Sequence, residues 1–326
     1  MNKTAINTLK ILRKIYVKIT KQKSEALPDS ELNPDTVSNL IYKTLIKNEP
    51  SLIARFGSTE LTCLINYLSV KNNDKNYLDF IKGDIESWWW NPNIITQMQQ
   101  WSGFFPPTLE KIEEFCELML RDIPQVDILG SWLSIENRVA DKLKAEKVHL
   151  RLLEPFWAKT PWTTALKGKK VLVVHPFNET IESQYKKRSL LFDKDILPEF
   201  ELITIQAVQS LGTGDHRFAD WFEALKFMQN EIDKTDYDIC LIGAGAYGFP
   251  LAAHVKRTGK KAIHMGGSLQ LLFGIKGRRW EDPNYGVKEW GIPTGSYSNL
   301  MNEHWVRPGD HLKPKNAQQV EGACYW

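Results

Sequence analysis

The feature of this sequence that most constrains its fold is a series of short apolar runs separated by amphipathic ones. The runs show no alternation of polar and apolar residues, and in the second half of the chain they are 170–175, 200–206, 238–242 and 261–264. A strand that is apolar on both sides is typical of a parallel sheet covered on both faces. Helical periodicity between them, as in 215–233, completes the pattern. The sequence therefore predicts an α/β fold, a Rossmann-like and mostly parallel sheet with helices on both faces.

The first half of the chain extends this pattern less regularly. An apolar strand is predicted at 51–56, followed by a glycine-containing turn and a helical run at 61–68. A further strand is predicted at 148–153. Residues 71–105 are polar and aromatic, and we expect irregular structure or short helices there.

Positive charge is concentrated at the start of the chain. Residues 1–24 contain seven Lys and Arg and no acid, whereas the whole chain has 42 basic and 39 acidic residues. Apolar residues recur among them near helical spacing, which predicts a basic amphipathic helix. Such a helix is expected either to lie on an anionic membrane surface or to pack on its own domain with a solvated basic face.

Composition and charge exclude several classes of protein. A net charge of +3 is too balanced to indicate a nucleic-acid partner. The four cysteines are scattered without a CxxC pair, which favours a reducing cytoplasm over secretion and indicates no structural zinc site. We expect residues 1–34 to form the helix and a linker, and 35–326 to form the main domain, with 35–165 and 166–326 as its two sub-lobes if it divides. The expected location is cytoplasmic, at the inner face of the membrane if the helix binds there.

Chemically unusual residues follow four of the predicted strands. Ligands of open parallel sheets bind outside the carboxyl ends of the strands, where loops meet helix N-termini. Here the segments at those ends are 55–60, 175–178, 243–247 and 264–267. We expect them to lie at one edge of the sheet.

The third of these segments carries a glycine-rich turn, GAGAYG, over 243–248. Gly243 and Gly245 allow the backbone to approach a phosphate, and Tyr247 stands where a helix begins. The dinucleotide fingerprint is imperfect, because the third glycine is displaced and His264 stands near the position of the ribose-binding acid. We therefore expect no NAD. The alternative is a tight turn that needs no ligand.

The fourth segment repeats the arrangement. His264 ends the strand, Gly266 and Gly267 open the next helix, and Gln270 lies one turn inside it. An imidazole at this place either donates to a diphosphate or serves as an acid or base. His175 is a third candidate at a strand end. Both histidines have the alternative of being hydrogen-bonded parts of the structure.

The first segment brings opposite charges together around Gly57. Arg55 presents a planar fork suited to phosphate or carboxylate, and Ser58 lies at the exposed turn that opens the helix. Glu60 is a candidate base or metal ligand. The alternative is an Arg55–Glu60 ion pair that ties the turn together.

Three other segments have two interpretations each. Lys276, Arg278 and Arg279 either meet phosphates or form a solvated basic face. Residues 88–90 (WWW) form a sugar-stacking wall or pack in a core. The tail 316–326 folds over the pocket or caps the sheet.

The ordered combination of these residues resembles a known family. The turn 54–60 (ARFGSTE) resembles the Arg-x-Gly-Asp-Gly-Glu signature of GT-D-type bacterial glycosyltransferases. The run 243–277 is similar to their late glycine loop and the His-x-Gly-Gly-x-x-Gln segment that follows. The resemblance covers most of residues 40–280.

The resemblance implies a Rossmann-like sheet that binds a nucleotide-diphosphate sugar and transfers the sugar to a growing surface glycan or lipid-linked acceptor. Members use an Asp-x-Glu pair with a divalent ion, Mn or Mg, but Ser58 replaces the Asp here. Only Glu60 remains as a metal ligand, and it is also the expected base. The rival functions are a non-catalytic component of a polysaccharide assembly complex and an NAD(P)-dependent sugar-nucleotide oxidoreductase.

Overall fold

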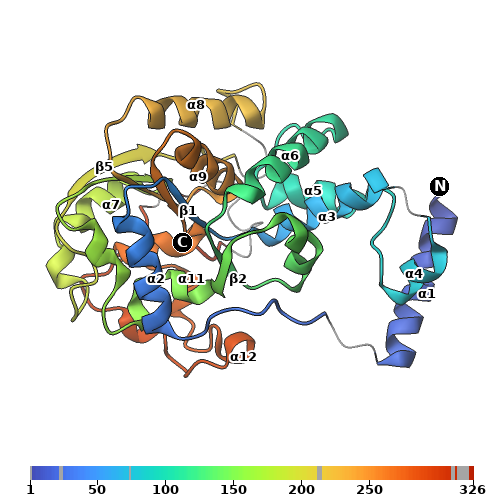
Figure 1. Cartoon of the computed structure of the whole chain (residues 1–326), viewed down its shortest axis with the longest axis horizontal. Helices are drawn as coiled ribbons and strands as arrows, with labels where there is room; N and C mark the ends of the chain where they lie inside the picture. Colours follow the sequence, from blue (N-terminus) through green and yellow to red (C-terminus); the bar gives the residue numbers. More distant parts are fainter. Residues whose placement is uncertain (1, 22–24, 73–74, 211–214, 310–312, 314–322) are drawn as a thin grey trace.

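A seven-stranded, all-parallel sheet forms the centre of the molecule (Figure 1). The computed structural model describes residues 2–21, 25–72, 75–210, 215–309, 313 and 323–326. The strands are β1 Ser51–Ala54, β2 Ile128–Ser131, β3 Glu146–His149, β4 Lys170–His175, β5 Glu201–Gln206, β6 Ile239–Ile242 and β7 Lys261–His264. Their order in the sheet is β3-β2-β1-β7-β6-β4-β5. The predicted α/β class and the parallel, Rossmann-like sheet are confirmed.

Helices cover both faces, as the lack of alternation in the strands predicts. Leu172 and Ile242 point into one core, with α3 Ser58–Asn72, α5 Pro92–Gln100, α6 Leu109–Asp122, α8 Trp221–Asp233 and α9 Gly248–Arg257. Val173 and Leu241 point into the other, with α2 Pro34–Ile46, α7 Asn178–Tyr185, α10 Leu269–Leu272 and α11 Arg278–Glu281. Successive residues of one strand thus enter opposite cores, and both must be apolar.

The remaining elements are short or lie at the periphery. The α-helices among them are α1 Lys3–Thr20, α4 Tyr77–Lys82 and α12 Val287–Trp290. The 3-10 helices are η1 Ile123–Gln125, η2 Ser134–Lys142, η3 Leu150–Leu153, η4 Pro155–Trp157, η5 Trp162–Leu166, η6 Arg188–Leu190, η7 Gly245–Tyr247, η8 Gly266–Ser268 and η9 Ser298–Leu300.

The chain leaves two neighbouring central strands in opposite directions. From β4 it runs through α7 outward to β5, whereas from β6 it runs through α9 to β7, toward the other edge. The loops after β4 and β6 therefore diverge, and a crevice forms between them at the carboxyl end of the sheet. This is the usual position of ligands in open parallel sheets.

The strands predicted at 51–56, 200–206 and 238–242 are one or two residues shorter in the structure, and two other elements differ more. The strand expected at 148–153 ends at His149, whose Nδ1 accepts a hydrogen bond from the Arg151 N–H and turns the chain into η3. The helix expected over 215–233 begins only at Trp221, because the Asp220 side chain caps it by accepting from the Glu223 N–H. Both corrections come from side-chain caps, which override periodicity locally.

The N-terminal helix lies apart from the sheet. Figure 1 shows α1 beside α4 at the end of the molecule, where Leu9, Phe80 and Trp88 form a small separate core. Within the described part of the chain, no helix is long and apolar enough to cross a membrane.

Candidate functional site

The loops that follow β1, β7, β6 and β4 line one cavity of about 580 Å³. These strands are consecutive in the sheet, so their carboxyl ends lie side by side. The candidate site residues from the sequence all line this cavity; they are Arg55, Gly57, Ser58, Glu60, His175, Gly243, Gly245, Tyr247, His264, Gly266, Gly267 and Gln270. The topology therefore brings together four segments that are far apart in the sequence.

Arg55 places an unpaired cation in the wall of the cavity. Its guanidinium stacks on the Trp132 ring, 4.9 Å from the centroid, and its Nε atom is buried without a hydrogen-bond partner. Burial lowers the pKa of Arg55, and the neighbouring Tyr325 and Glu60 oppose that shift. Among the described residues no hydrogen bond or ion pair satisfies this side chain, so the predicted Arg55–Glu60 pair does not form. A half-buried guanidinium with an unpartnered Nε is a strong binding group for an anion.

Glu60 lies in the first turn of α3, with its carboxylate folded over Gly57. A Cβ atom at position 57 would overlap Glu60 Oε2, so this close approach requires glycine. Both residues line the cavity. The turn thus presents one carboxylate and the N-terminus of a 15-residue helix to the same space.

The donor set of the cavity does not fit a resident divalent ion. Glu60 is the one carboxylate among the described residues that line it, and the residue two positions before it is Ser58. No group of three or more His, Cys, Asp or Glu within the described ranges is arranged to hold a metal. Arg55 adds a fixed positive charge to the same wall, which disfavours a cation.

His175 is a neutral hydrogen-bond donor. Its Nδ1 accepts a bond of 3.0 Å from the Phe177 N–H, so the ring proton belongs on Nε2. Burial lowers the pKa of His175 to about 3. A Cβ atom at Gly243 would lie 2.6 Å from the ring and 2.8 Å from the Gly266 oxygen. Glycine at 243 therefore allows the loops of β4, β6 and β7 to meet.

His264 is also neutral. The side chain is 3% exposed, and its Nδ1 lies 3.4 Å from the Ile242 oxygen. Burial, helped by the charge of Arg55, lowers the pKa of His264 to about 3. So low a pKa makes the ring a weak base at neutral pH, which favours the hydrogen-bonding role over proton transfer.

Gln270 holds the end of the chain against the cavity. Its Nε2 donates to the Tyr325 oxygen at 3.2 Å, while its buried Oε1 has no partner. The Tyr325 ring packs on Gly267, and Trp326 contacts Phe177 edge-on with the ring centroids 5.6 Å apart. Residues 323–326 thus fold over the cavity, as one interpretation of the tail predicts; residues 316–322 of that tail lie outside the described residues.

A second arginine reaches the cavity from α11. Arg279 lies near the rings of Trp280, Tyr285 and Tyr325, with the Tyr325 centroid 5.1 Å from its Cζ, and it lines the cavity. Its neighbours in the predicted basic cluster, Lys276 and Arg278, are not among the lining residues.

Several lining residues have no signal in the sequence. Trp101, Trp132 and Ser210 come from loops that the sheet topology brings in. Ser210 hydrogen-bonds the Tyr247 hydroxyl at 2.8 Å, and Tyr247 stacks on Trp221 at 4.7 Å. The tryptophans of 88–90 are not among the lining residues, and Trp88 packs in the small core below α1.

Comparisons with protein-family models, with curated proteins and with solved structures find no match to this chain. The functional argument consequently depends on the geometry of the cavity and on the motifs that line it.

A buried carboxyl supports the β7 loop from behind. Glu154 is 8% exposed and accepts hydrogen bonds from the Tyr297 hydroxyl at 2.8 Å and from Trp157 Nε1 at 3.0 Å. It also bonds the side chain of Ser268, which follows Gly267. Burial raises the pKa of Glu154 to about 7.

This shift predicts a pH-dependent stability. The folded pKa of Glu154 exceeds its ordinary 4.5, so its contribution is complete below pH 4.5 and is lost as the pH rises to 7. At about 1.4 kcal/mol per pH unit the loss is roughly 3 kcal/mol. We expect the free energy of unfolding of Glu154→Gln in urea, taken relative to that of the wild type, to rise by about 3 kcal/mol between pH 5 and 7.5, because this difference cancels the opposite contributions of the buried histidines. Glu289→Gln, a change of an exposed carboxylate, is the control. If the free energy of unfolding depends on pH in Glu154→Gln as it does in the wild type, the raised pKa of Glu154 is contradicted.

Proposed function

We propose that this protein is a glycosyltransferase of the GT-D kind. It transfers a sugar from a nucleotide-diphosphate sugar, a UDP-sugar in the first instance, to a glycan or lipid-linked acceptor in bacterial surface polysaccharide synthesis. The observation that carries the proposal is the half-buried Arg55, whose buried Nε has no hydrogen-bond partner, at a cavity where two glycine loops meet. Its volume of about 580 Å³ is within the range of small-molecule sites.

The diphosphate is the part of the substrate that this cavity is best equipped to bind. Arg55 supplies a bidentate cation, and Arg279 adds a second positive charge. His175 supplies a neutral Nε2–H, and the N-terminus of α3 opens onto the same space. These groups are fixed before the substrate arrives, so they stabilise the negative charge that develops as the diphosphate leaves.

Glu60 is the proposed base for the acceptor. The acceptor hydroxyl oxygen attacks the anomeric carbon, the bond from that carbon to the diphosphate oxygen breaks, and the hydroxyl proton passes to the Glu60 carboxylate. Glu60 is the one carboxylate among the described lining residues, so no second acidic group competes for this role. The aromatic faces of Trp101, Trp132 and Tyr325 offer apolar surface for the base and the sugar.

We expect transfer without a resident metal ion. The two arginines replace the charge that a divalent ion supplies in family members with the Asp-x-Glu pair. Transfer of radiolabelled sugar should therefore survive EDTA with less than a twofold change in rate. A loss of more than tenfold that added Mn²⁺ restores contradicts this prediction.

Isothermal titration with UDP-, GDP- and dTDP-sugars tests the function directly. One nucleotide class should bind, and NAD(P) should not. If the folded protein binds none of these nucleotide sugars, the proposal is overturned. If it binds NAD(P) alone, an oxidoreductase is favoured.

A further inference from the structure

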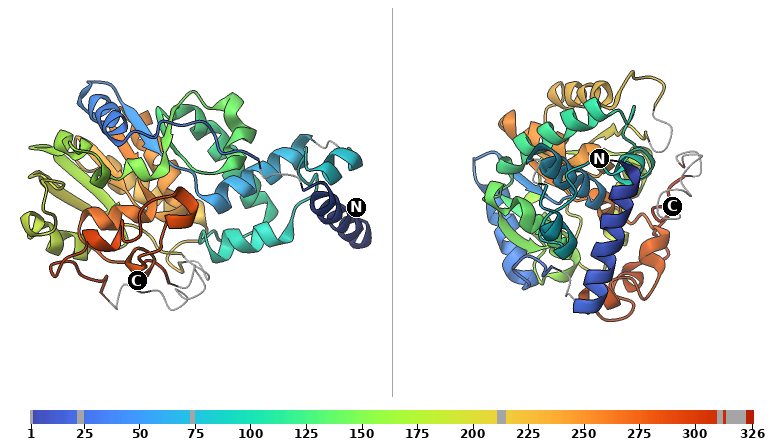
Figure 2. Two further views of the ribbon diagram at one scale, coloured as in Figure 1. Left: turned by 90° about the horizontal axis from the view of Figure 1, so that it is seen from below. Right: turned by 90° about the vertical axis from the view of Figure 1, so that its right-hand side faces the viewer.

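The three sides of α1 differ: one packs on the domain, one is apolar and exposed, and one is basic. The helix begins with an Asn2 cap and ends at Lys21. In Figure 2 (right), α1 runs across the end of the molecule, with its outer side uncovered by other described elements. An ordinary surface helix buries its apolar stripe and exposes the remainder.

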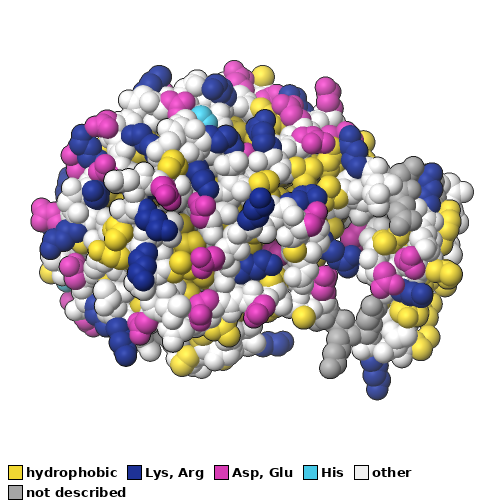
Figure 3. All heavy atoms as spheres, in the orientation of Figure 1, with side chains coloured by type: hydrophobic (Ala, Val, Ile, Leu, Met, Phe, Trp, Pro, Cys, Tyr) yellow, Lys and Arg dark blue, Asp and Glu magenta, His cyan; other side chains and the backbone are white. Residues whose placement is uncertain are grey.

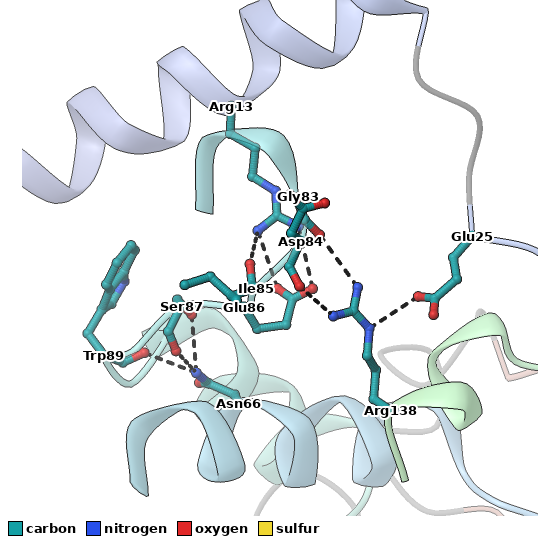
Figure 4. A network of polar contacts seen from close by, with 10 residues as sticks. All are labelled: Arg13, Glu25, Asn66, Gly83, Asp84, Ile85, Glu86, Ser87, Trp89 and Arg138. Carbon is teal, nitrogen blue, oxygen red and sulfur yellow. Dashed lines mark hydrogen bonds and ion pairs between the residues drawn. The ribbon is translucent and has the colours of Figure 1, made fainter. Parts of the chain in front are cut away.

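The first side anchors α1 to the domain. Leu9 is buried against Phe80 and Trp88, and the Arg13 guanidinium lies 4.9 Å from the centroid of the Phe80 ring. Arg13 also forms an ion pair with Glu86, at 3.4 Å (Figure 4). Figure 4 further shows Arg138 bridging Glu25, just after α1, to backbone oxygens of the α4 region. The orientation of α1 is thereby fixed.

The second side is apolar and faces outward. Ile11, Ile15 and Ile19 follow one another at a spacing of four residues, and Leu12 lies beside them. Ile11 is 57% exposed, Ile15 48%, Ile19 76% and Leu12 42%. Figure 3 shows hydrophobic side chains along the outer edge of this end of the molecule. A contiguous exposed stripe of this kind marks an interaction surface.

The third side, next to the apolar stripe, is basic. It is formed by Lys3, Lys10, Lys14, Lys18 and Lys21, which recur at helical spacing. No acidic residue occurs among residues 1–24 to neutralise them. An apolar stripe bordered by lysines is complementary to the surface of a bilayer, where acyl chains lie beneath anionic headgroups.

We propose that the outer side of α1 (Ile11, Leu12, Ile15, Ile19 and the five lysines) binds the surface of a membrane that contains anionic lipid. The helix lies flat, the isoleucines enter the headgroup boundary, and the lysines reach the lipid phosphates. A second copy of the chain fits this surface less well, because two such helices would bring their lysine stripes together. This inference does not depend on the proposed sugar transfer.

Vesicle sedimentation with the 326-residue protein tests the proposal. Binding is expected to phosphatidylcholine vesicles that contain 30% phosphatidylglycerol, and to be at least tenfold weaker without it. Changing Lys10, Lys14 and Lys18 to Gln should weaken binding about 100-fold, because each lysine near an anionic surface contributes about fivefold. The matched control changes Lys47, Lys167 and Lys226, which are exposed elsewhere, and should weaken binding less than threefold.

The apolar stripe is tested by Ile15→Asp with Ile19→Asp. This variant should lose vesicle binding while its circular dichroism spectrum and thermal midpoint stay unchanged, because neither side chain packs on the domain. Equal binding to charged and neutral vesicles, or binding to neither, overturns the proposal. So does a dimer in sedimentation equilibrium that the same variant dissociates, since the occupant would then be a second copy.

Discussion

Replacing Arg55 with Met is expected to weaken binding of the nucleotide sugar by about 30-fold or more. Removing one charged partner from a buried, hydrogen-bonded ion contact costs roughly 2–5 kcal/mol, and every 1.4 kcal/mol is tenfold in affinity. Methionine retains an apolar surface against Trp132, so the cavity wall keeps its packing. Isothermal titration of the wild-type and variant proteins measures the loss.

Two controls make the Arg55 result specific. Arg278→Met changes an exposed arginine of α11 that is not among the lining residues, and its affinity should stay within twofold of the wild type. Arg55→Met should not lower the thermal midpoint of the protein without ligand, because it removes a half-buried cation whose Nε has no partner and keeps an apolar contact with Trp132. Unchanged affinity in Arg55→Met contradicts the assignment of Arg55 to the diphosphate.

Glu60→Gln is expected to lower kcat for sugar transfer by 10²- to 10⁴-fold, the range that a general base supplies. The amide has nearly the shape of the carboxylate and still folds over Gly57, so affinity for the nucleotide sugar should change by less than threefold. Initial rates with saturating donor, together with titration of the donor, separate the two quantities. Glu49→Gln, an exposed change before β1, is the control and should leave both unchanged.

The same variant distinguishes an enzyme from a binding component. If a non-catalytic protein holds the nucleotide sugar within a polysaccharide assembly complex, Glu60→Gln should support assembly as well as the wild type does. A kcat within threefold of the wild type would remove Glu60 from the catalytic role, even if Arg55→Met abolishes binding. The two substitutions thus test binding and chemistry separately.

The central sheet and the convergence of the loops were predictable because each depends on local signals. A parallel strand buried on both faces must be apolar throughout, and 170–175 and 261–264 have those bounds in the structure. The carboxyl ends of parallel strands share an edge, so the sequence predicts that Arg55, Gly243 and His264 lie together.

The rest of the site depends on contacts between distant segments. Trp132 stacks on Arg55, and the carbonyl oxygen of Tyr325 accepts from Gln270; no local pattern marks either pairing. The neutrality of His264 likewise follows from its burial next to Arg55, which is a property of the folded state. In α1, periodicity predicts an amphipathic helix, but only the packing on Phe80 determines which apolar side chains stay outside.

The position of β7 affects how this chain can be made. Among the described residues β7 is the last strand in sequence order, yet it lies between β1 and β6. It joins the part of the sheet from the first half of the chain to the part from the second. While the protein emerges from the ribosome, β1 therefore keeps an open, hydrogen-bonding edge until residues 261–264 have been synthesised. Nascent chains are consequently exposed to misassembly late in translation, and a fragment ending before β7 would retain that unpaired edge.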